Sequence, residues 1–397
     1  MASQFSSAIK ATEGEAAHPC AELQGSLPEK HGLRGDSSWQ AAQLASQAED
    51  LARPGYSTSI AHEYLDVDVV LQAKVKMLAE FLKQSKRAVI YAGAGLSTAS
   101  GIGDYASKSG SIVSQNSSHG FLSPYSLKPN LGHMTISAMV QGGLIWRIVQ
   151  QNHDALLQKA GVPQQSINEI HGSWFDPSNP VVKMYESLRA DLYDDVSQVE
   201  HEADLVVVLG SSLAGMSTDR IVHACAARSS SSSNGDGQFG SVIVSLQRTP
   251  HDGECSLRIF ATIDRVMELL ASELSNELSV EKEMTVGEEG ISSGPRDLDN
   301  LDTDVFDVPY GSDGMRIDDP DAPRRRWDLQ EGAKLVVTLG ADKDQEAVIL
   351  GKHPEGHYKV SVQRKGGPAS IRYLGSWWVR AALKGEVPHI PLVTRSS

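Results

Sequence analysis

A glycine-rich turn after a short apolar run is the first feature of this chain that could bind a ligand. Residues 88–106 read AVIYAGAGLSTASGIGDYA. Glycines such as Gly93 and Gly95 let a backbone approach a phosphate without a Cβ in the way. The spacing departs from the common dinucleotide fingerprint, because Thr98 stands where its third glycine would be and no acidic residue occurs between residues 106 and 130. The turn disfavours an ordinary dehydrogenase and leaves two interpretations, a phosphate-binding loop or a plain tight turn.

A polar cluster and a single histidine could act on such a ligand. Residues 150–154 read QQNHD and end an apolar run, and open α/β sheets place ligand groups at the ends of buried strands. His171 lies further along the chain, directly before Gly172. Its imidazole titrates near neutrality and is therefore a candidate general base. A histidine before a glycine is, by itself, more often structural.

The elements that must position these residues alternate between helix and strand patterns. Helices are expected over residues 38–52, 66–83, 131–141 and 155–161. Buried strands are expected over residues 88–91, 144–149, 203–209 and 242–246, followed by a strand and a helix in residues 257–275. This alternation predicts an α/β fold with a doubly wound, parallel, Rossmann-like sheet.

Changes in composition divide the 397 residues into five parts. Residues 1–60 carry few large apolar groups and are expected to form a mostly disordered N-terminal extension, ahead of a main domain at residues 61–277. Residues 278–326 are acidic, with Gly, Pro and Asp, and indicate a linker. Residues 327–385 contain short β-runs separated by turns such as HPEGH and RKGGP, which predicts a small C-terminal all-β barrel, followed by a tail at residues 386–397.

The composition excludes several classes of protein. The chain has 36 Lys and Arg against 50 Asp and Glu, a formal charge of −14, so neither direct nucleic-acid binding nor attachment to an anionic membrane is expected. Its cysteines, Cys20, Cys225 and Cys255, form no CxxC pair, so we expect no disulfide scaffold and no metal site. No apolar run is long enough to span a bilayer and no signal peptide is found. These features predict an intracellular protein, nuclear or cytoplasmic.

Six segments together resemble the sirtuin family, the NAD-dependent protein deacylases. They follow one another in the order and approximate spacing of that family, over residues 66–273. The segments are GAGLSTASGIGDYA, PNLGHMT, QNHDALLQKAG, EIHG, ADLVVVLGSSL and VSLQRTP. The resemblance implies an NAD-binding catalytic domain with a reduced small lobe, whose partners are proteins with acylated lysines, such as histones. The implied products are the deacylated lysine, nicotinamide and an O-acyl-ADP-ribose.

Carried over residue by residue, the resemblance implies the functional residues. His171 would be the catalytic base that activates a ribose hydroxyl, and Asn152 would orient the reacting water or ribose, whereas His133 and His153 are not expected to be catalytic. Cofactor contacts are implied for Gly93, Ala94, Gly95, Ser97, Asp104, Tyr105, Gln151, Asn152, Asp154, Gly210, Ser211, Ser212 and Ser245. Substrate contacts are implied for Val181, Val182 and Tyr185.

The chain departs from the sirtuin pattern where the family has a zinc ribbon. That ribbon needs four cysteines after the catalytic His-Gly, but no cysteine lies between Ser173 and Gly210 here. The metal module is therefore expected to be absent. Packing of Trp174, Phe175 and Tyr185 is a candidate replacement for its support of the small lobe.

A second departure lies in the glycine-rich stretch itself. The family's Pro-Asp-Phe-Arg reads Gly103-Asp104-Tyr105-Ala106 in this chain. The tyrosine keeps the ring that would cover nicotinamide, whereas Ala106 removes a guanidinium that would touch the phosphates. The absence of this guanidinium should reduce turnover more than it reduces cofactor binding. Ser245 likewise replaces the usual asparagine at the adenine-side ribose.

The C-terminal barrel resembles SH3-like or Tudor-like modules. The last of its β-runs is expected at residues 371–377. Tyr358, Tyr373, Trp377 and Trp378 could form a surface that binds a peptide or a methylated lysine by cation–π attraction, or they could be barrel core. Because neighbours on a strand point to opposite faces, at most one of the two tryptophans is needed in the core.

Three functions are compatible with these features. The first is a zinc-free, sirtuin-like deacylase of protein acyl-lysine that consumes NAD. The second is another transfer that consumes NAD, either ADP-ribosylation of protein or NAD hydrolysis, which the missing arginine and altered small lobe would favour. The third is a non-catalytic protein that binds NAD or ADP-ribose and interacts with partners through its barrel.

Overall fold

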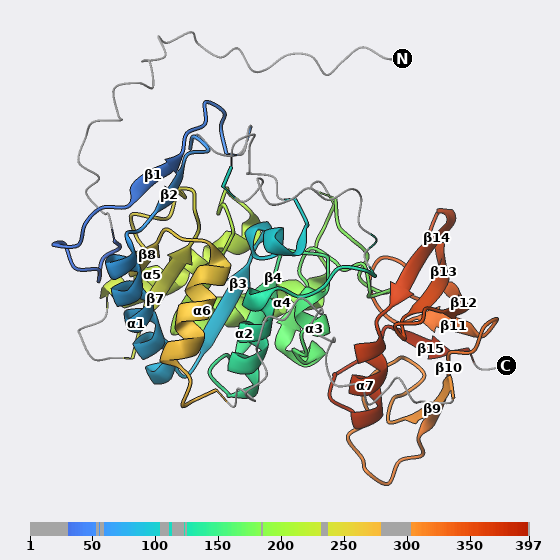
Figure 1. The fold of residues 1–397 in the computed structure, drawn as a ribbon. Coiled ribbons are helices and arrows are strands. Elements are labelled where there is room, and N and C mark those ends of the chain that lie inside the picture. The colour runs from blue at the N-terminus through green and yellow to red at the C-terminus, as the bar shows by residue number, and fades with distance from the viewer. Residues whose placement is uncertain are drawn as a thin grey trace, which may run out of the picture.

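A six-stranded parallel sheet lies at the centre of the protein in this computed structural model (Figure 1). The structure describes residues 31–52, 55, 59–103, 111–112, 123, 125–183, 186–231, 237–278 and 303–395. The strands of this sheet are β3 (Ala88–Ala92), β4 (Arg147–Gln150), β5 (Ile167–Asn168), β6 (Leu205–Leu209), β7 (Gly240–Val244) and β8 (Leu257–Ile259). They lie in the order β5-β4-β3-β6-β7-β8, all parallel. The predicted doubly wound α/β fold is confirmed.

Side chains of the central strands enter two apolar layers in turn. Ile90 lies in one layer, and its neighbours Val89 and Tyr91 lie in the other. Helices α1 (Asp68–Gln84), α2 (Leu131–Gln141) and α6 (Ile263–Glu273) supply the first layer, and α4 (Ala190–Glu202) and α5 (Arg220–Ser231) the second (Figure 1). No helix among the described residues is long and apolar enough to cross a membrane.

The predicted helix over residues 38–52 is wrong. This segment contains strand β1 (Gln43–Ser46), which pairs antiparallel with β2 (Glu63–Leu65). Its side chains are mostly exposed, so there is no apolar face that packing could use to stabilise a helix. Upstream of β1, the amide of Leu33 donates to the carbonyl of Cys255 at 2.8 Å. The described part of the N-terminal extension therefore packs against the main domain beside β8.

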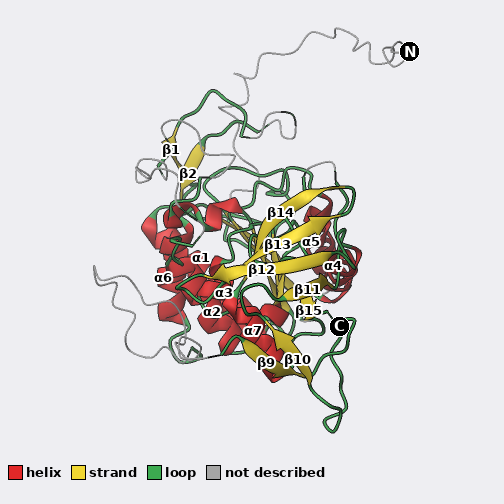
Figure 2. Ribbon diagram, turned by 90° about the vertical axis from the view of Figure 1, so that its right-hand side faces the viewer, coloured by secondary structure: helices red, strands yellow, loops and turns green. Residues whose placement is uncertain are grey.

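An antiparallel sheet of five strands lies in the C-terminal part, in the order β14-β13-β12-β11-β15 (Figure 2). These strands are β11 (Lys334–Val337), β12 (Glu346–Lys352), β13 (Tyr358–Arg364), β14 (Gly367–Leu374) and β15 (Leu392–Thr394). A separate pair, β9 (Val305–Val308) and β10 (Arg325–Asp328), begins inside the segment expected to be a linker. The segment at residues 278–326 is acidic, but three of its side chains are buried, namely Phe306, Val308 and Tyr310. The likeness to SH3-like or Tudor-like barrels stays a prediction.

The strand predicted at residues 371–377 is wrong at its end. Trp377 and Trp378 lie on helix α7 (Ser376–Lys384), which begins after Gly375. Neighbouring helical residues lie about 100° apart around the axis, so both indoles can face the core. They are 6% and 3% exposed, and Tyr358 is buried as well. These three rings are core, and Tyr373 is half-buried.

The loop at residues 173–179 joins the main domain to the C-terminal part. Phe175 is fully buried in the C-terminal core, with its ring 5.4 Å from that of Trp377. Arg372 Nη1 donates to the carbonyl of Pro177 at 2.6 Å. The C-terminal part therefore supports the loop where sequence analysis expected aromatic packing of the small lobe alone. Composition could not predict this, because the contacts join segments that are far apart in the chain.

Candidate functional site

Two glycine-containing turns lie against each other at the carboxyl ends of β3 and β6. The amide of Gly93 donates to the carbonyl of Leu209 at 2.9 Å, and that of Gly95 to the carbonyl of Gly210 at 2.9 Å. A Cβ on Gly93 would lie 2.6 Å from the Cα of Ser211, and one on Gly95 would lie 2.8 Å from the Cα of Gly210. Gly210 has a φ of +64°, which favours glycine. The contact between the turns therefore requires these glycines.

This contact lies where the order of the sheet reverses. β3 is central, with β4 on one side and β6 on the other, and sheets of this order bind ligands outside the carboxyl ends of these strands. The structure brings most of the implied cofactor residues to this edge. They are Gly93, Ala94, Gly95 and Ser97 after β3, Gln151, Asn152 and Asp154 after β4, and Gly210, Ser211 and Ser212 after β6.

Ser97 is the centre of a buried hydrogen-bond network. It is 1% exposed, and its hydroxyl donates to Asp154 Oδ2 at 2.6 Å and accepts from Asn152 Nδ2 at 3.1 Å. Asn152 Nδ2 also donates to the carbonyl of Gly93 at 2.9 Å. These side chains hold the glycine loop from the inside. The contact between Ser97 and a diphosphate stays a prediction, as does the role of Asn152 in orienting a reacting group.

His133 packs beside this network and caps helix α2. Its backbone amide and its Nδ1 both donate to Asn130 Oδ1, at 3.1 and 2.6 Å. Burial lowers the pKa of His133 to about 4, so its imidazole is neutral at physiological pH. These contacts give His133 a structural role at the start of α2.

A second network, which the sequence analysis missed, is centred on the Tyr91 hydroxyl. The hydroxyl donates to Asp219 Oδ1 at 2.7 Å and accepts from Gln151 Nε2 at 2.6 Å. Ser211 Oγ donates to Gln151 Oε1 at 3.1 Å, which ties together the ends of β3, β4 and β6. Burial raises the pKa of Tyr91 well above its usual value, so the phenol stays protonated. A tyrosine in an otherwise aliphatic strand, next to a glycine turn, was the available signal.

His171 follows β5 at the same edge of the sheet. The amide of Val182 donates to the carbonyl of His171 at 2.9 Å, so Val181 and Val182, the implied substrate residues, run beside it. His153 Nδ1 donates to the carbonyl of Gly172 at 2.9 Å. The loop after β4 thereby holds the loop that carries His171. Sequence reasoning set His153 aside and missed this positioning contact.

A buried carboxyl group lies two residues before His171. Glu169 is 3% exposed, and Gln164 Nε2 donates to its Oε2 at 3.4 Å. Burial, with a smaller contribution from the charge of Asp176, raises the pKa of Glu169 to about 7. The stability of this loop should therefore depend on pH in the neutral range.

The other residues implied by the resemblance lie away from the two glycine turns or outside the described residues. Ser245 follows β7, two strands from β3, and its amide donates to the carbonyl of Ile259 at 3.2 Å. Asp104, Tyr105, Ala106 and Tyr185 lie outside the described residues. The ring that would cover nicotinamide and the substrate contacts of Val181, Val182 and Tyr185 all stay predictions.

Comparison with known proteins finds similar sequences, although no family model matches the chain. NAD-dependent protein deacetylase SRT1 of Arabidopsis thaliana is 26% identical over 266 residues, 57% of this chain and 53% of that protein. The chain is thus similar, at low identity, to NAD-dependent protein deacetylases. Human NAD-dependent protein deacetylase sirtuin-7 is 26% identical over 260 residues, 54% of this chain and 64% of that protein.

The likeness to the plant deacetylases covers only part of each protein. The chain spans about half the length of the plant relatives that it matches. Among solved structures, a Sir2 complex with a p53 peptide and NAD⁺ is 22% identical, with a TM-score of 0.43, and the match covers 51% of this chain and 99% of that one.

The residues at the switch point fit the dinucleotide that sirtuins use. Gly93 and Gly95 belong to a loop that follows the carboxyl end of a central parallel strand, where sheets of this order bind dinucleotides. The surrounding donors are neutral, namely the hydroxyl of Ser211 and the amide of Gln151, and such groups suit ribose hydroxyls and phosphate oxygens. The donor set is therefore compatible with NAD.

Proposed function

We propose that this protein is an NAD-dependent protein-lysine deacylase of the sirtuin type. The observation that carries the proposal is the convergence, at the switch point of the sheet, of the glycine loop, the Gln151–Asp154 segment and the Gly210 turn. The similarity to NAD-dependent protein deacetylases supports the same activity.

In this proposal the residues have distinct tasks. The glycine loop and the Gly210 turn hold the diphosphate, and Gln151 and Asn152 face the nicotinamide ribose, with Asp104 and Tyr105 closing the pocket. NAD, when bound, supplies a ribose C1′ whose bond to nicotinamide is cleaved as the acyl oxygen attacks. His171 then takes a proton from a ribose hydroxyl, and Val181, Val182 and Tyr185 bind the acylated peptide.

Product analysis tests this proposal. The full chain is incubated with NAD and a panel of acyl-lysine peptides, and the products are identified by mass spectrometry. We expect the deacylated peptide and an O-acyl-ADP-ribose in equal amounts. ADP-ribosylated protein, or free ADP-ribose without deacylation, would replace the proposal with the second function. NAD binding without any turnover would replace it with the third.

A further inference from the structure

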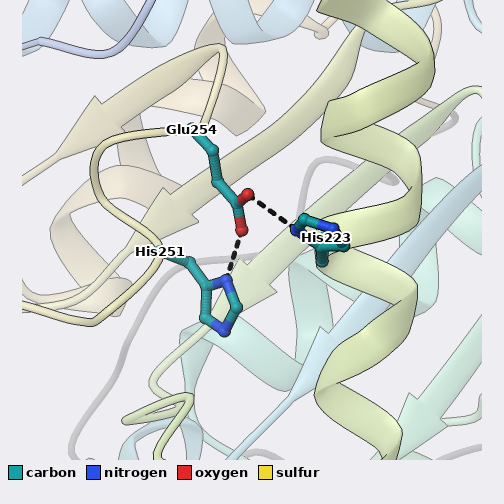
Figure 3. Close-up of side chains that lie close together, drawn as sticks. All are labelled: His223, His251 and Glu254. Carbon is teal, nitrogen blue, oxygen red and sulfur yellow. Dashed lines mark hydrogen bonds and ion pairs between the residues drawn. The ribbon is translucent and has the colours of Figure 1, made fainter.

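A cluster of two histidines and a glutamate lies outside the proposed NAD site. His223 is on helix α5, and His251 and Glu254 are on the loop between β7 and β8. Figure 3 shows the carboxylate of Glu254 between the two imidazoles. His223 Nδ1 donates to Glu254 Oε2 at 2.7 Å, and His251 Nδ1 donates to Glu254 Oε1. One ligand atom from each residue lies within 4.8 Å of the others.

We propose that His223, His251 and Glu254 form a binding site for a divalent transition-metal ion such as Zn²⁺. In the metal-bound form each neutral imidazole carries its single proton on Nε2 and binds the ion through Nδ1, so the ion takes the place of the two hydrogen bonds to the carboxylate. Imidazole and carboxylate ligands suit Zn²⁺ and its neighbours in the periodic table, whereas Mg²⁺ and Ca²⁺ prefer oxygen ligands alone. Three protein ligands leave at least one coordination position for water.

The surroundings of the cluster suit such a site. The side chains of His223, His251 and Glu254 are 63%, 23% and 32% exposed, so an ion can enter from solvent. The loop itself is held from beneath, because the buried Arg258 donates to Asp252 Oδ1 at 2.7 Å. Two ligands on a fixed loop and one on a rigid helix need little reorganisation to close around an ion.

The sequence analysis expected no metal site, and these three ligands show no metal-binding spacing that could have indicated one. His251 and Glu254 are close in the chain, but His223 belongs to another element. The site is also distinct from the sirtuin zinc ribbon, which requires cysteines after the catalytic histidine. A bound ion would link α5 to the loop after β7 and thus brace the second helical layer of the main domain.

Zinc titration of the full chain tests the site. We compare the wild type with the variants His223→Ala and Glu254→Gln, and with His201→Ala, an exposed histidine on α4 whose Nδ1 donates to the carbonyl of Ser197 at 2.6 Å. We expect the wild type and His201→Ala to bind one more equivalent of Zn²⁺ than the triple variant His223→Ala/His251→Ala/Glu254→Gln. Each single variant should lose about tenfold or more in affinity.

Two controls keep the test decisive. Thermal unfolding without metal shows that each variant is folded, and a Mg²⁺ titration should give no binding at this cluster. Equal Zn²⁺ stoichiometry and affinity in the wild type and the triple variant would overturn the site. Equally tight binding of Mg²⁺ would overturn the assigned class of ion.

Discussion

At the residue scale, the contact between the two glycine turns leaves no room for a side chain. Gly93 and Gly95 meet the backbone of Ser211 and Gly210, not flexible side chains that could move aside. Any Cβ at these positions has to push the two turns apart. The close contact with the second turn therefore constrains the residues at Gly93 and Gly95, whether or not the loop binds a phosphate.

Gly95→Ala should separate the turns and weaken NAD binding. The added Cβ would lie 2.8 Å from the Cα of Gly210, and such overpacking costs about 1–3 kcal/mol. Isothermal titration with NAD should show about a tenfold or greater loss of affinity. Gly367→Ala on β14 is the matched control, because its Cβ meets only the Cβ of Arg364 at 3.8 Å; its affinity should equal that of the wild type. An unchanged NAD affinity of Gly95→Ala would contradict the assignment of this turn to the NAD site.

Tyr91→Phe should destabilise the main domain. The substitution removes the hydroxyl and leaves the carboxyl of Asp219 and the amide of Gln151 each without one buried partner. Leaving such groups unsatisfied costs about 1–3 kcal/mol. Urea unfolding should show this loss, with Tyr64→Phe as a control in which the half-buried ring keeps its packing on Phe260. Equal losses of unfolding free energy in Tyr91→Phe and Tyr64→Phe would show that the hydrogen bonds of Tyr91 make no special contribution to stability.

The gathering of these loops at one edge of the sheet could be predicted from sequence, but their hydrogen-bond networks could not. Glycine turns and polar clusters after apolar runs mark strand ends, and parallel strands bring their ends to one edge. By contrast, the partners of Tyr91 come from two segments far from it in the chain, Gln151 after β4 and Asp219 before α5, and His153 donates to the carbonyl of Gly172 on another loop. Spacing along the chain carries no information about such contacts.

At the scale of elements, continuous burial made the parallel strands recognisable. All five residues of β3 and of β6 are buried, because helices cover both faces of the sheet. The helix predicted over residues 38–52 is wrong for the opposite reason, because β1 in this segment is mostly exposed and has no apolar stripe. The two tryptophans were assigned to a strand because a two-residue pattern cannot distinguish strand from helix.

Glu169, in the segment after β5, should make stability depend on pH. Its pKa is about 7 in the folded protein against 4.5 as the ordinary value. The unfolded state therefore releases this proton first as pH rises. The stabilising contribution is complete below about pH 4.5, decreases as pH rises and is lost once pH passes about 7.

Glu169→Gln isolates this contribution. The amide imitates the protonated carboxyl, so the variant should be more stable than the wild type at pH 8 and similar to it at pH 5. Urea unfolding at both values measures the difference. A variant that is equally destabilised at both values would show that the carboxyl makes contacts which an amide cannot replace.

At the scale of the whole molecule, the C-terminal part is joined to the loop that follows the candidate base. Phe175 lies in the C-terminal core, and its loop begins directly after His171-Gly172. A second hydrophobic core, which the C-terminal part supplies, therefore orders the loop after His171 and Gly172.

Phe175→Ala should loosen this connection. Removing a fully buried phenylalanine costs about 3–5 kcal/mol, and the loss should lower the melting temperature and increase proteolysis of residues 173–183. Ile371→Ala, on β14 of the same part, is the control because Ile371 is 50% exposed. It should behave like the wild type. If the two variants have the same melting temperature and protease resistance, the docking contributes nothing to stability.

The release of nicotinamide from NAD is the most direct test of the proposed deacylase activity. Wild type and His171→Tyr are each incubated with NAD, with and without an acetyl-lysine peptide, and free nicotinamide is quantified alongside NAD affinity. We expect the wild type to release nicotinamide only when the acetylated peptide is present. We expect His171→Tyr to lose deacetylation while it still binds NAD. Release that ignores the peptide, or deacetylation that survives in His171→Tyr, would contradict the proposed activity.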